Sequence, residues 1–289
     1  MLIIGCSNSK KLAKSISSIL KVKYSELTVK HFPDKELYIK FETEVKNEEV
    51  VLVQTLKPAN EAILEIILAC NTAKELGAKK VTLVVPYLAY IRQDKRFNTG
   101  EVVSSKIIGK LLSCFDKIIT IDPHLHRFKS LNEMFNTKTE KLTANELIKE
   151  YIKKSYKNPV IIGPDEESYQ WAKEVADAVG ANAAILKKQR FSATKVKEVL
   201  ESPIDVKNKD VVIIDDILST GKTILEAIKH IKNHKPKSIN VIAVHGVFAD
   251  EVTHKKIKAS TNSLITTNTI ENPHAKIDVS LLITKALKE

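Results

Sequence analysis

The chain has 289 residues, of which 43% are hydrophobic and 28% are charged, so it predicts about two globular domains with full-sized cores. Its formal net charge of +11 comes from 46 basic and 35 acidic residues, which first suggests a nucleic-acid surface. The lysines are dispersed over every predicted helix, however, and aromatic residues make up only 6%, so the composition favours small anionic substrates and argues against a nucleic-acid partner.

Short apolar runs alternate with longer helical segments along the whole chain. Strands are predicted at Leu2–Ile4, Val50–Val53, Val81–Val85, Ile118–Ile121, Val160–Ile162, Val211–Ile214 and Ile239–Val244. Helices are predicted at Glu61–Leu76, Val102–Leu112, Ser168–Val179 and Thr223–Asn233. This alternation predicts an α/β fold in which mostly parallel sheets are flanked by helices.

An internal repeat predicts two similar halves. Val50–Val53 leads to Ala62–Glu65, and Val211–Ile214 leads to Thr223–Glu226 at the same offset. A constant offset through strand, loop and helix argues against chance similarity. One βα unit is therefore present twice.

The boundary between the halves is predicted at Lys141–Asn158, a lysine-rich amphipathic stretch that precedes Pro159. It gives an N-terminal domain of residues 1–145 and a C-terminal domain of residues 146–289. The final segment, Ile277–Leu287, is a candidate for a return to the first half.

The segment from Val211 to Thr223 predicts a site for a sugar phosphate. Asp215 and Asp216 follow a buried strand, at the edge where open α/β sheets bind ligands. Gly221 permits a tight turn into the next helix, whose unpaired N–H groups can hold an anion. A nucleoside-triphosphate P-loop is excluded because Asp216 stands where that motif needs glycine. A helix cap beside a solvated loop is the remaining alternative.

This segment resembles the phosphoribosyl-diphosphate (PRPP) loop shared by type I phosphoribosyltransferases and ribose-phosphate pyrophosphokinases. The resemblance implies that Asp215 and Asp216 hold the ribose hydroxyls. It also implies that the following residues wrap the 5-phosphate: Ser219, Thr220, Gly221, Lys222 and Thr223. The first half has lost this cradle, because Gln54-Thr55 replaces the aspartate pair.

Two further segments favour the enzyme that makes PRPP over those that consume it. Pro86–Phe97 closely resembles the pyrophosphokinase signature, in which arginine and glutamine contact ATP, and it implies that Arg92, Gln93 and Asp94 bind ATP. His31–Glu36 resembles that family's adenine-side loop. It implies that the aromatic ring stacks on the base and that the acids receive its amino group, which are the roles of Phe32, Asp34 and Glu36.

Two residues are the expected magnesium contacts. His124 follows one predicted strand and Asp165 follows another, and triphosphate chemistry requires Mg²⁺ held by few protein groups. The resemblance implies the metal role for both residues. His126 is a further candidate contact for phosphate.

A basic turn at the end of a predicted strand resembles the family's mobile catalytic loop. The resemblance implies that Lys188 and Arg190 are catalytic and that Arg190 also contacts ribose 5-phosphate. Lys187 is adjacent, so the register can be one residue out. A solvated basic turn is the alternative.

Together these motifs, in the family's order, predict two domains of the type I phosphoribosyltransferase kind. The resemblance implies transfer of a diphosphoryl group from ATP to ribose 5-phosphate with Mg²⁺, by a homo-oligomer of two or more chains. A phosphoribosyltransferase and a non-catalytic paralogue remain alternatives. Three cysteines without metal-site spacing indicate reduced core thiols and a cytoplasmic protein. No signal peptide or membrane-spanning stretch is expected.

Overall fold

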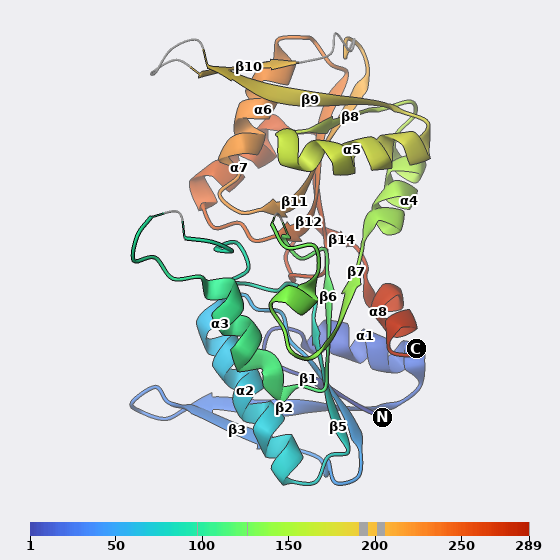
Figure 1. Cartoon of the computed structure of the whole chain (residues 1–289). Coiled ribbons are helices and arrows are strands. Elements are labelled where there is room, and N and C mark those ends of the chain that lie inside the picture. The colour runs from blue at the N-terminus through green and yellow to red at the C-terminus, as the bar shows by residue number, and fades with distance from the viewer. Residues whose placement is uncertain (97, 126, 191–195, 201–205, 289) are drawn as a thin grey trace. The chain divides into compact units, whose positions relative to one another are not determined.

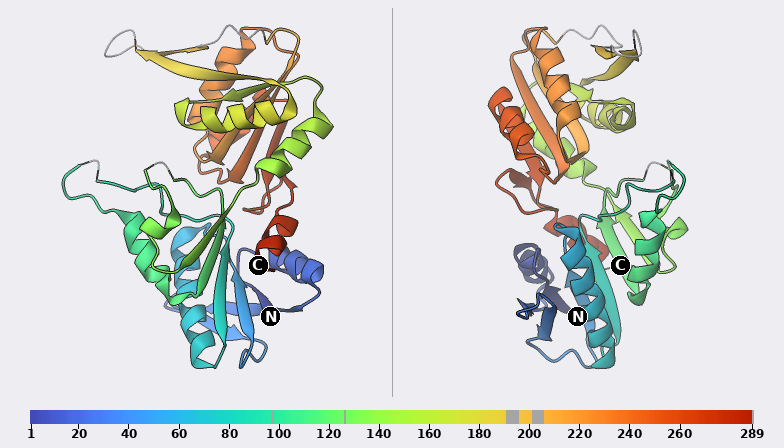
Figure 2. Two further views of the ribbon diagram at one scale, coloured as in Figure 1. Left: turned by 45° about the vertical axis from the view of Figure 1, so that its right-hand side comes forward. Right: turned by 90° about the vertical axis from the view of Figure 1, so that its left-hand side faces the viewer.

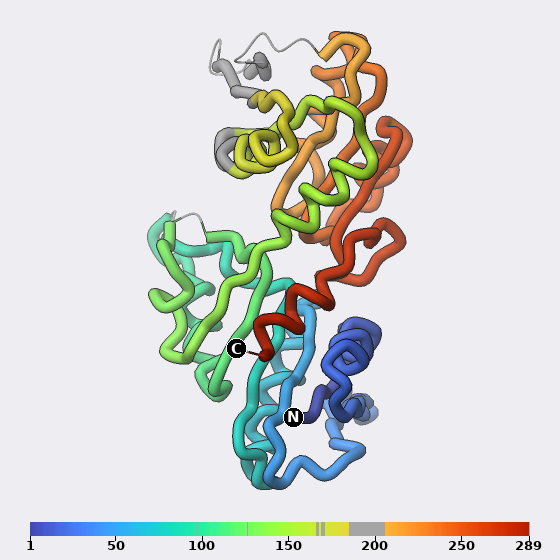
Figure 3. The backbone as a smooth tube through the Cα atoms, turned by 90° about the vertical axis from the view of Figure 1, so that its right-hand side faces the viewer, coloured from blue at the N-terminus to red at the C-terminus, as the bar shows by residue number. Residues whose placement is uncertain are grey.

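The structure is a computed structural model, and it describes residues 1–289 except 97, 126, 191–195, 201–205 and 289 (Figure 1). Side chains at 166, 167, 169, 170 and 185–200 also lie outside the description. The chain divides into two units. Unit 1 comprises residues 1–143, 269–271 and 279–289, and unit 2 comprises residues 144–268 and 272–278. Both termini therefore belong to unit 1 (Figure 3).

Unit 1 is built on a mostly parallel sheet with the strand order β3-β2-β1-β4-β5-β6-β7, in which only β3 runs antiparallel to its neighbour. Its elements are β1 (Leu2–Gly5), α1 (Lys10–Leu20), β2 (Lys23–His31), β3 (Leu37–Phe41), β4 (Glu49–Val53), α2 (Ala59–Glu75), β5 (Lys80–Val85), α3 (Ser104–Leu111), the 3-10 helix η1 (Leu112–Cys114), β6 (Lys117–Ile121), η2 (Leu131–Glu133), β7 (Lys138–Leu142) and α8 (Ser280–Ala286).

Unit 2 repeats this arrangement with the order β10-β9-β8-β11-β12-β13-β14, and only β10 is antiparallel to its neighbour. Its elements are α4 (Asn145–Ser155), β8 (Val160–Gly163), α5 (Glu166–Val179), β9 (Asn182–Arg190), β10 (Val196–Leu200), β11 (Asp210–Leu218), α6 (Lys222–Lys232), β12 (Ser238–Gly246), α7 (Glu251–Ser260), β13 (Ser263–Thr267) and β14 (Ala275–Ile277).

The repeat in the sequence is a repeat in structure. Leu2 pairs with Val50 in the sheet of unit 1, and Val160 pairs with Val211 in the sheet of unit 2. Val50 and Val211 are corresponding positions of the repeat found in the sequence. The predicted α/β fold with two mostly parallel sheets is thus confirmed.

Each sheet reverses its strand order at one point, between β1 and β4 in unit 1 and between β8 and β11 in unit 2. Right-handed crossovers then place the following helices on opposite faces. In unit 1, α1 covers one face, and α2 and α3 cover the other (Figure 2). Ligands bind α/β sheets at the carboxyl ends of the strands beside such a switch point.

Two helices, α4 and α8, belong to a different unit from the strand that precedes them in the chain. α4 follows β7 in the chain but belongs to unit 2, where it packs on α5. α8 follows β14 but belongs to unit 1, where it packs on α1. The buried Lys117 ammonium donates to the Ala286 carbonyl at 3.2 Å and pairs with Glu140 at 2.6 Å, which holds the end of α8 in unit 1. The predicted division after residue 145 stays a prediction.

Candidate active site

The carboxyl end of β11 carries the predicted phosphate loop. β11 is longer than the sequence suggested, because Asp215 still pairs with Ala243 of β12 after the ladder with β8 has ended at Ile213. The strand ends at Leu218, Gly221 has a φ of +71°, and α6 begins at Lys222. In this described stretch no side chain caps the start of α6. Its first N–H groups therefore remain suited to an anion.

The segment that follows β12 forms backbone hydrogen bonds with the start of the phosphate loop. The N–H groups of Val247 and Phe248 donate to the Leu218 carbonyl at 3.0 Å, and the Ala249 N–H donates to the Ser219 carbonyl at 3.0 Å. Asp250 then caps α7. The start of the loop is thus held by backbone hydrogen bonds, while Thr220 and Lys222 stay exposed.

Replacing Gly221 by valine should weaken ribose 5-phosphate binding by roughly 10²-fold and leave ATP binding nearly unchanged. The left-handed φ disfavours any side chain, and a Cβ would lie 2.6 Å from Ile257 Cδ1, so either the loop or the buried Ile257 side chain would have to shift. Binding of each substrate can be measured by calorimetry.

Gly180→Ala is the matched control for this substitution. Gly180 has a φ of +67° at the end of α5, with nothing within 4 Å of its would-be Cβ. It carries the same backbone strain without the contact with α7. Equal weakening of both substrates by the valine variant would show that Gly221 has only a structural role.

Three carboxylates interact electrostatically beside the switch point of unit 2, those of Asp165, Asp215 and Asp216. Asp215 keeps part of its surface exposed, but desolvation of its carboxyl group, with repulsion from Asp216 and Asp165, raises its pKa well above the usual range. Asp216 and Ile217 donate backbone N–H groups to Oδ1 of Asp215 and Asp216, at 3.0 and 2.7 Å. The repulsion marks a place where a cation or hydroxyl donors would be stabilising.

Asp165 has a structural task that the sequence reasoning missed. It is the N-cap of α5, and its Oδ1 accepts from the Ser168 N–H at 2.9 Å and from the Ser168 hydroxyl at 2.8 Å. The signal was present, since aspartate is a preferred N-cap residue and Asp165 stands between a predicted strand and a predicted helix. The cap fixes the carboxylate at the end of β8.

These oxygen donors fit a magnesium ion better than a softer metal. Among the described residues, no three His, Cys, Asp or Glu side chains are spaced to hold a metal by themselves. Mg²⁺ commonly keeps several waters and binds through one or two carboxylates together with substrate phosphates. The carboxylates of Asp165, Asp215 and Asp216 in unit 2 are suited to this mode of Mg²⁺ binding.

The predicted adenine-side residues form a tight turn between β2 and β3 in unit 1. Lys35 stands at a φ of +72°, a left-handed conformation that glycine adopts more readily than lysine. The Phe32 N–H donates to the Glu36 carbonyl at 2.9 Å, and the Glu36 N–H donates to Asp34 Oδ1 at 3.2 Å. Phe32 is 49% exposed, with its ring edge-on to Tyr38. Its ring is therefore accessible for stacking.

The loop after β5 carries the three residues that are predicted to bind ATP, Arg92, Gln93 and Asp94. Arg92 is exposed and Gln93 is half-buried. Asp94 is buried, and its carboxylate is paired with Arg127 at 2.8 Å. Arg127 was missed by the sequence reasoning, although it stands three residues after His124. The pair ties the loop after β5 to the loop after β6.

The remaining predicted site residues are His124, His126, Lys188 and Arg190. His124 is half-buried in the loop after β6, and it belongs to unit 1, whereas Asp165 belongs to unit 2. His126 lies outside the described residues. Lys188 and Arg190 lie near the end of β9, opposite Glu198 and Val196 of β10. Their backbone is described, but their side chains are outside the description.

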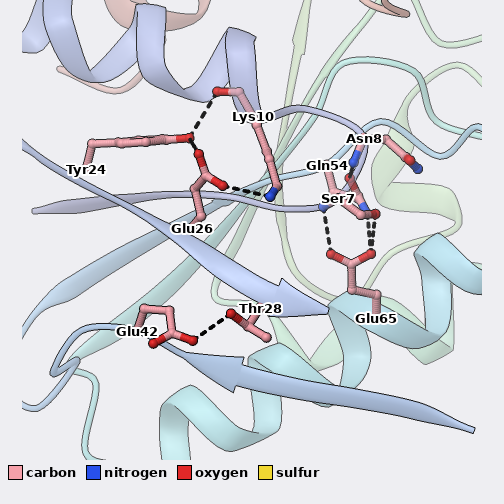
Figure 4. A network of polar contacts seen from close by, with 9 residues as sticks. All are labelled: Ser7, Asn8, Lys10, Tyr24, Glu26, Thr28, Glu42, Gln54 and Glu65. Carbon is pink, nitrogen blue, oxygen red and sulfur yellow. Dashed lines mark hydrogen bonds and ion pairs between the residues drawn. The ribbon is translucent and has the colours of Figure 1, made fainter. Parts of the chain in front are cut away.

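Unit 1 has a buried carboxylate on α2 that binds the loops after β1 and β4 (Figure 4). Glu65 is 2% exposed and accepts from the Ser7 N–H at 2.9 Å, the Ser7 hydroxyl at 2.5 Å and Gln54 Nε2 at 2.8 Å. Gln54 Oε1 in turn accepts from the Asn8 N–H at 2.9 Å. The donors of Ser7 after β1 and of Gln54 after β4 are thus satisfied by an acceptor within unit 1.

Replacing Glu65 by alanine should lower the free energy of unfolding by about 1–3 kcal/mol, because the buried Gln54 amide would lose its charged acceptor and Ser7 would lose two hydrogen bonds. Glu65→Gln should cost about 1 kcal/mol and serves as the control for size. Desolvation raises the Glu65 pKa, so the wild type should lose stability as pH rises from about 4 through that raised value. Urea unfolding at several pH values tests this, and a Glu65→Gln variant with the same pH dependence would contradict it.

Comparison with known proteins gives a consistent result. The family of N-terminal domains of ribose phosphate pyrophosphokinase matches residues 1–115, and the phosphoribosyl transferase domain family matches residues 130–283. The chain is 36% identical to a ribose-phosphate pyrophosphokinase of Methanothermobacter thermautotrophicus over 100% of both chains. It is 35% identical to that of Saccharolobus solfataricus, over 99% of this chain and 100% of the relative.

A solved structure supports the fold. Phosphoribosylpyrophosphate synthetase from Mycobacterium smegmatis superimposes with a TM-score of 0.86 over 99% of this chain and 97% of that one, at 24% identity.

Within the described residues, the helices are all too short or too polar to cross a membrane.

Proposed function

The chain belongs to the ribose-phosphate pyrophosphokinase family, and from this premise we propose how its two units divide the reaction. The enzyme transfers the diphosphoryl group of ATP to the anomeric hydroxyl of ribose 5-phosphate, giving PRPP and AMP. The anomeric oxygen attacks the β-phosphorus in line. Such a transfer depends mainly on positioning and on stabilisation of charge.

Unit 2 binds the acceptor in this proposal. The observation that carries it is the loop at the end of β11, with a left-handed Gly221, an uncapped helix start and carboxylates beside it. Asp215 and Asp216 accept from the ribose hydroxyls. The 5-phosphate receives hydrogen bonds from the loop residues Ser219, Thr220, Gly221, Lys222 and Thr223.

Unit 1 binds ATP in this proposal. Phe32 is exposed for stacking on adenine, and Asp34 and Glu36 lie in the same turn. Arg92 and Gln93 contact the triphosphate, and Asp94 holds that loop through its pair with Arg127. Lys188 and Arg190 neutralise the charge that develops on the transferred group, and Arg190 also contacts ribose 5-phosphate.

Mg²⁺ is the proposed cofactor, with His124 and Asp165 as its protein contacts. When bound, the ion neutralises phosphate charge and orients the diphosphoryl group. The chain's own task is to hold oxygen donors in place, which the cap of α5 does for Asp165. We further propose the domain division 1–145 and 146–289, a cytoplasmic location and a homo-oligomer of at least two chains.

Product analysis from ATP and ribose 5-phosphate should give AMP in amounts equal to PRPP, with no ADP. The reason is that the β,γ-diphosphoryl group leaves as one unit, so the nucleotide keeps only its α-phosphate. Separation of the nucleotides by ion-exchange chromatography provides the measurement. ADP as the sole nucleotide product would overturn this reaction, and reaction of PRPP with a free base would point to a phosphoribosyltransferase.

A further inference from the structure

Two thiols from distant parts of the chain meet in unit 1. Cys70 lies in α2 and is fully buried, whereas Cys114 ends η1 and is partly exposed. The Cys70 thiol donates to the Cys114 carbonyl oxygen at 3.3 Å, and the Cys114 thiol donates to the Leu111 carbonyl oxygen at 3.8 Å. The sequence alone predicted reduced core thiols. The contact between Cys70 and Cys114 depends on the fold, so it was not predicted.

The surroundings make the two thiols chemically unequal. Interaction between the two thiol groups raises the pKa of Cys70 and lowers the pKa of Cys114. Lys74, one helical turn after Cys70, lowers both pKa values, and Asp116 opposes it while paired with Lys74 at 3.0 Å. Cys114 is therefore both the accessible thiol and the one that ionises more readily. Those are the properties of a thiol that reacts with oxidants.

We propose that Cys114 is an oxidation site for hydroperoxides and that Cys70 converts its product into a Cys70–Cys114 disulfide. The Cys114 thiolate attacks the peroxide, so an S–O bond forms, the O–O bond breaks, and the leaving oxygen takes a proton. The Cys70 sulfur then attacks the Cys114 sulfur. An S–S bond forms, the S–O bond breaks, and water leaves with the Cys70 proton. Two thiols have then given two electrons to the peroxide.

The disulfide would join α2 to the turn before β6. Between the two cysteines lie β5, the loop that carries Arg92 and Gln93, and α3. A cross-link that closes so long a segment restricts the unfolded chain and stabilises the folded one. We expect the oxidised protein to melt about 5 °C or more above the reduced protein.

The test treats the full-length protein with hydrogen peroxide, alkylates the remaining thiols and maps the peptides by mass spectrometry. Cys6 is the internal control, because burial raises its pKa far above the usual range. The expected result is a Cys70–Cys114 linked peptide and an alkylated Cys6. Retention of all three thiols, preferential loss of Cys6, or disulfides only between molecules would overturn the proposal.

Two serine variants separate the steps. In Cys70→Ser, Cys114 should stop at the sulfenic acid, which dimedone traps. In Cys114→Ser, Cys70 should stay reduced, and neither variant should show the rise in melting temperature. Oxidation of Cys70 in the Cys114→Ser protein would show that Cys114 is not the reacting thiol.

Discussion

Replacing Lys188 by alanine is expected to lower kcat by roughly 10²–10³ while the affinities for ATP and ribose 5-phosphate change only a few-fold. Lys188 is proposed to act on charge that exists only as the diphosphoryl group transfers. An interaction made only in the transition state affects kcat and leaves ground-state binding in place. Initial rates over both substrates, together with calorimetric affinities, provide the measurement.

Lys187→Ala is the matched control. The expected catalytic pair is Lys188 and Arg190, so position 187 is the neighbour that would carry the role if the register were one residue out. If the register is right, Lys187→Ala should be nearly silent. A large loss from Lys187 with none from Lys188 would place the loop one residue out of register, and silence from both would indicate a solvated basic turn.

The central strands could be predicted because their signal is local. Val160–Ile162, Val81–Val85 and Ile118–Ile121 are apolar runs interrupted only by the buried Thr82 and Thr120, as expected for strands buried on both faces. The observed strands differ by only a residue at an end. The sequence reasoning did not identify β7 (Lys138–Leu142) or the hairpin of β2 and β3. β3 and β7 are the edge strands of their sheet, and β2 lies next to β3. All three carry lysines and other polar residues, which are typical of protected edges and resemble a loop in sequence.

The candidate site divides in the same way. The left-handed turn at Gly221 follows from the short sequence around it, so it could be predicted. The pairing of Asp94 with Arg127, by contrast, joins loops after two different strands. The internal acceptor Glu65 joins α2 to the loop after β1. Contacts of this kind depend on which strands are neighbours in the sheet, and a single sequence does not contain that information.

Replacing Asp215 by asparagine is expected to lower kcat/KM for ribose 5-phosphate by roughly 10²-fold and yet to stabilise the folded protein by about 1 kcal/mol. The two effects have one cause. The carboxylate is desolvated and repelled by Asp216 and Asp165, so the folded protein without ligand gains when one charge is removed. The ligand hydroxyls lose a charged acceptor at the same time. Initial rates and urea unfolding of the free enzyme measure both quantities.

Asp210→Asn is the matched control on the same strand. Asp210 begins β11, and its carboxylate pairs with Lys237 at 3.0 Å and accepts from the Ser238 hydroxyl at 2.6 Å, which lowers its pKa. Its replacement should cost about 1 kcal/mol of stability and leave catalysis unchanged. Opposite responses from two aspartates on one strand would separate a charge kept for its ligand from one kept for the fold. A loss of stability in Asp215→Asn would show that Asp215, too, serves the fold.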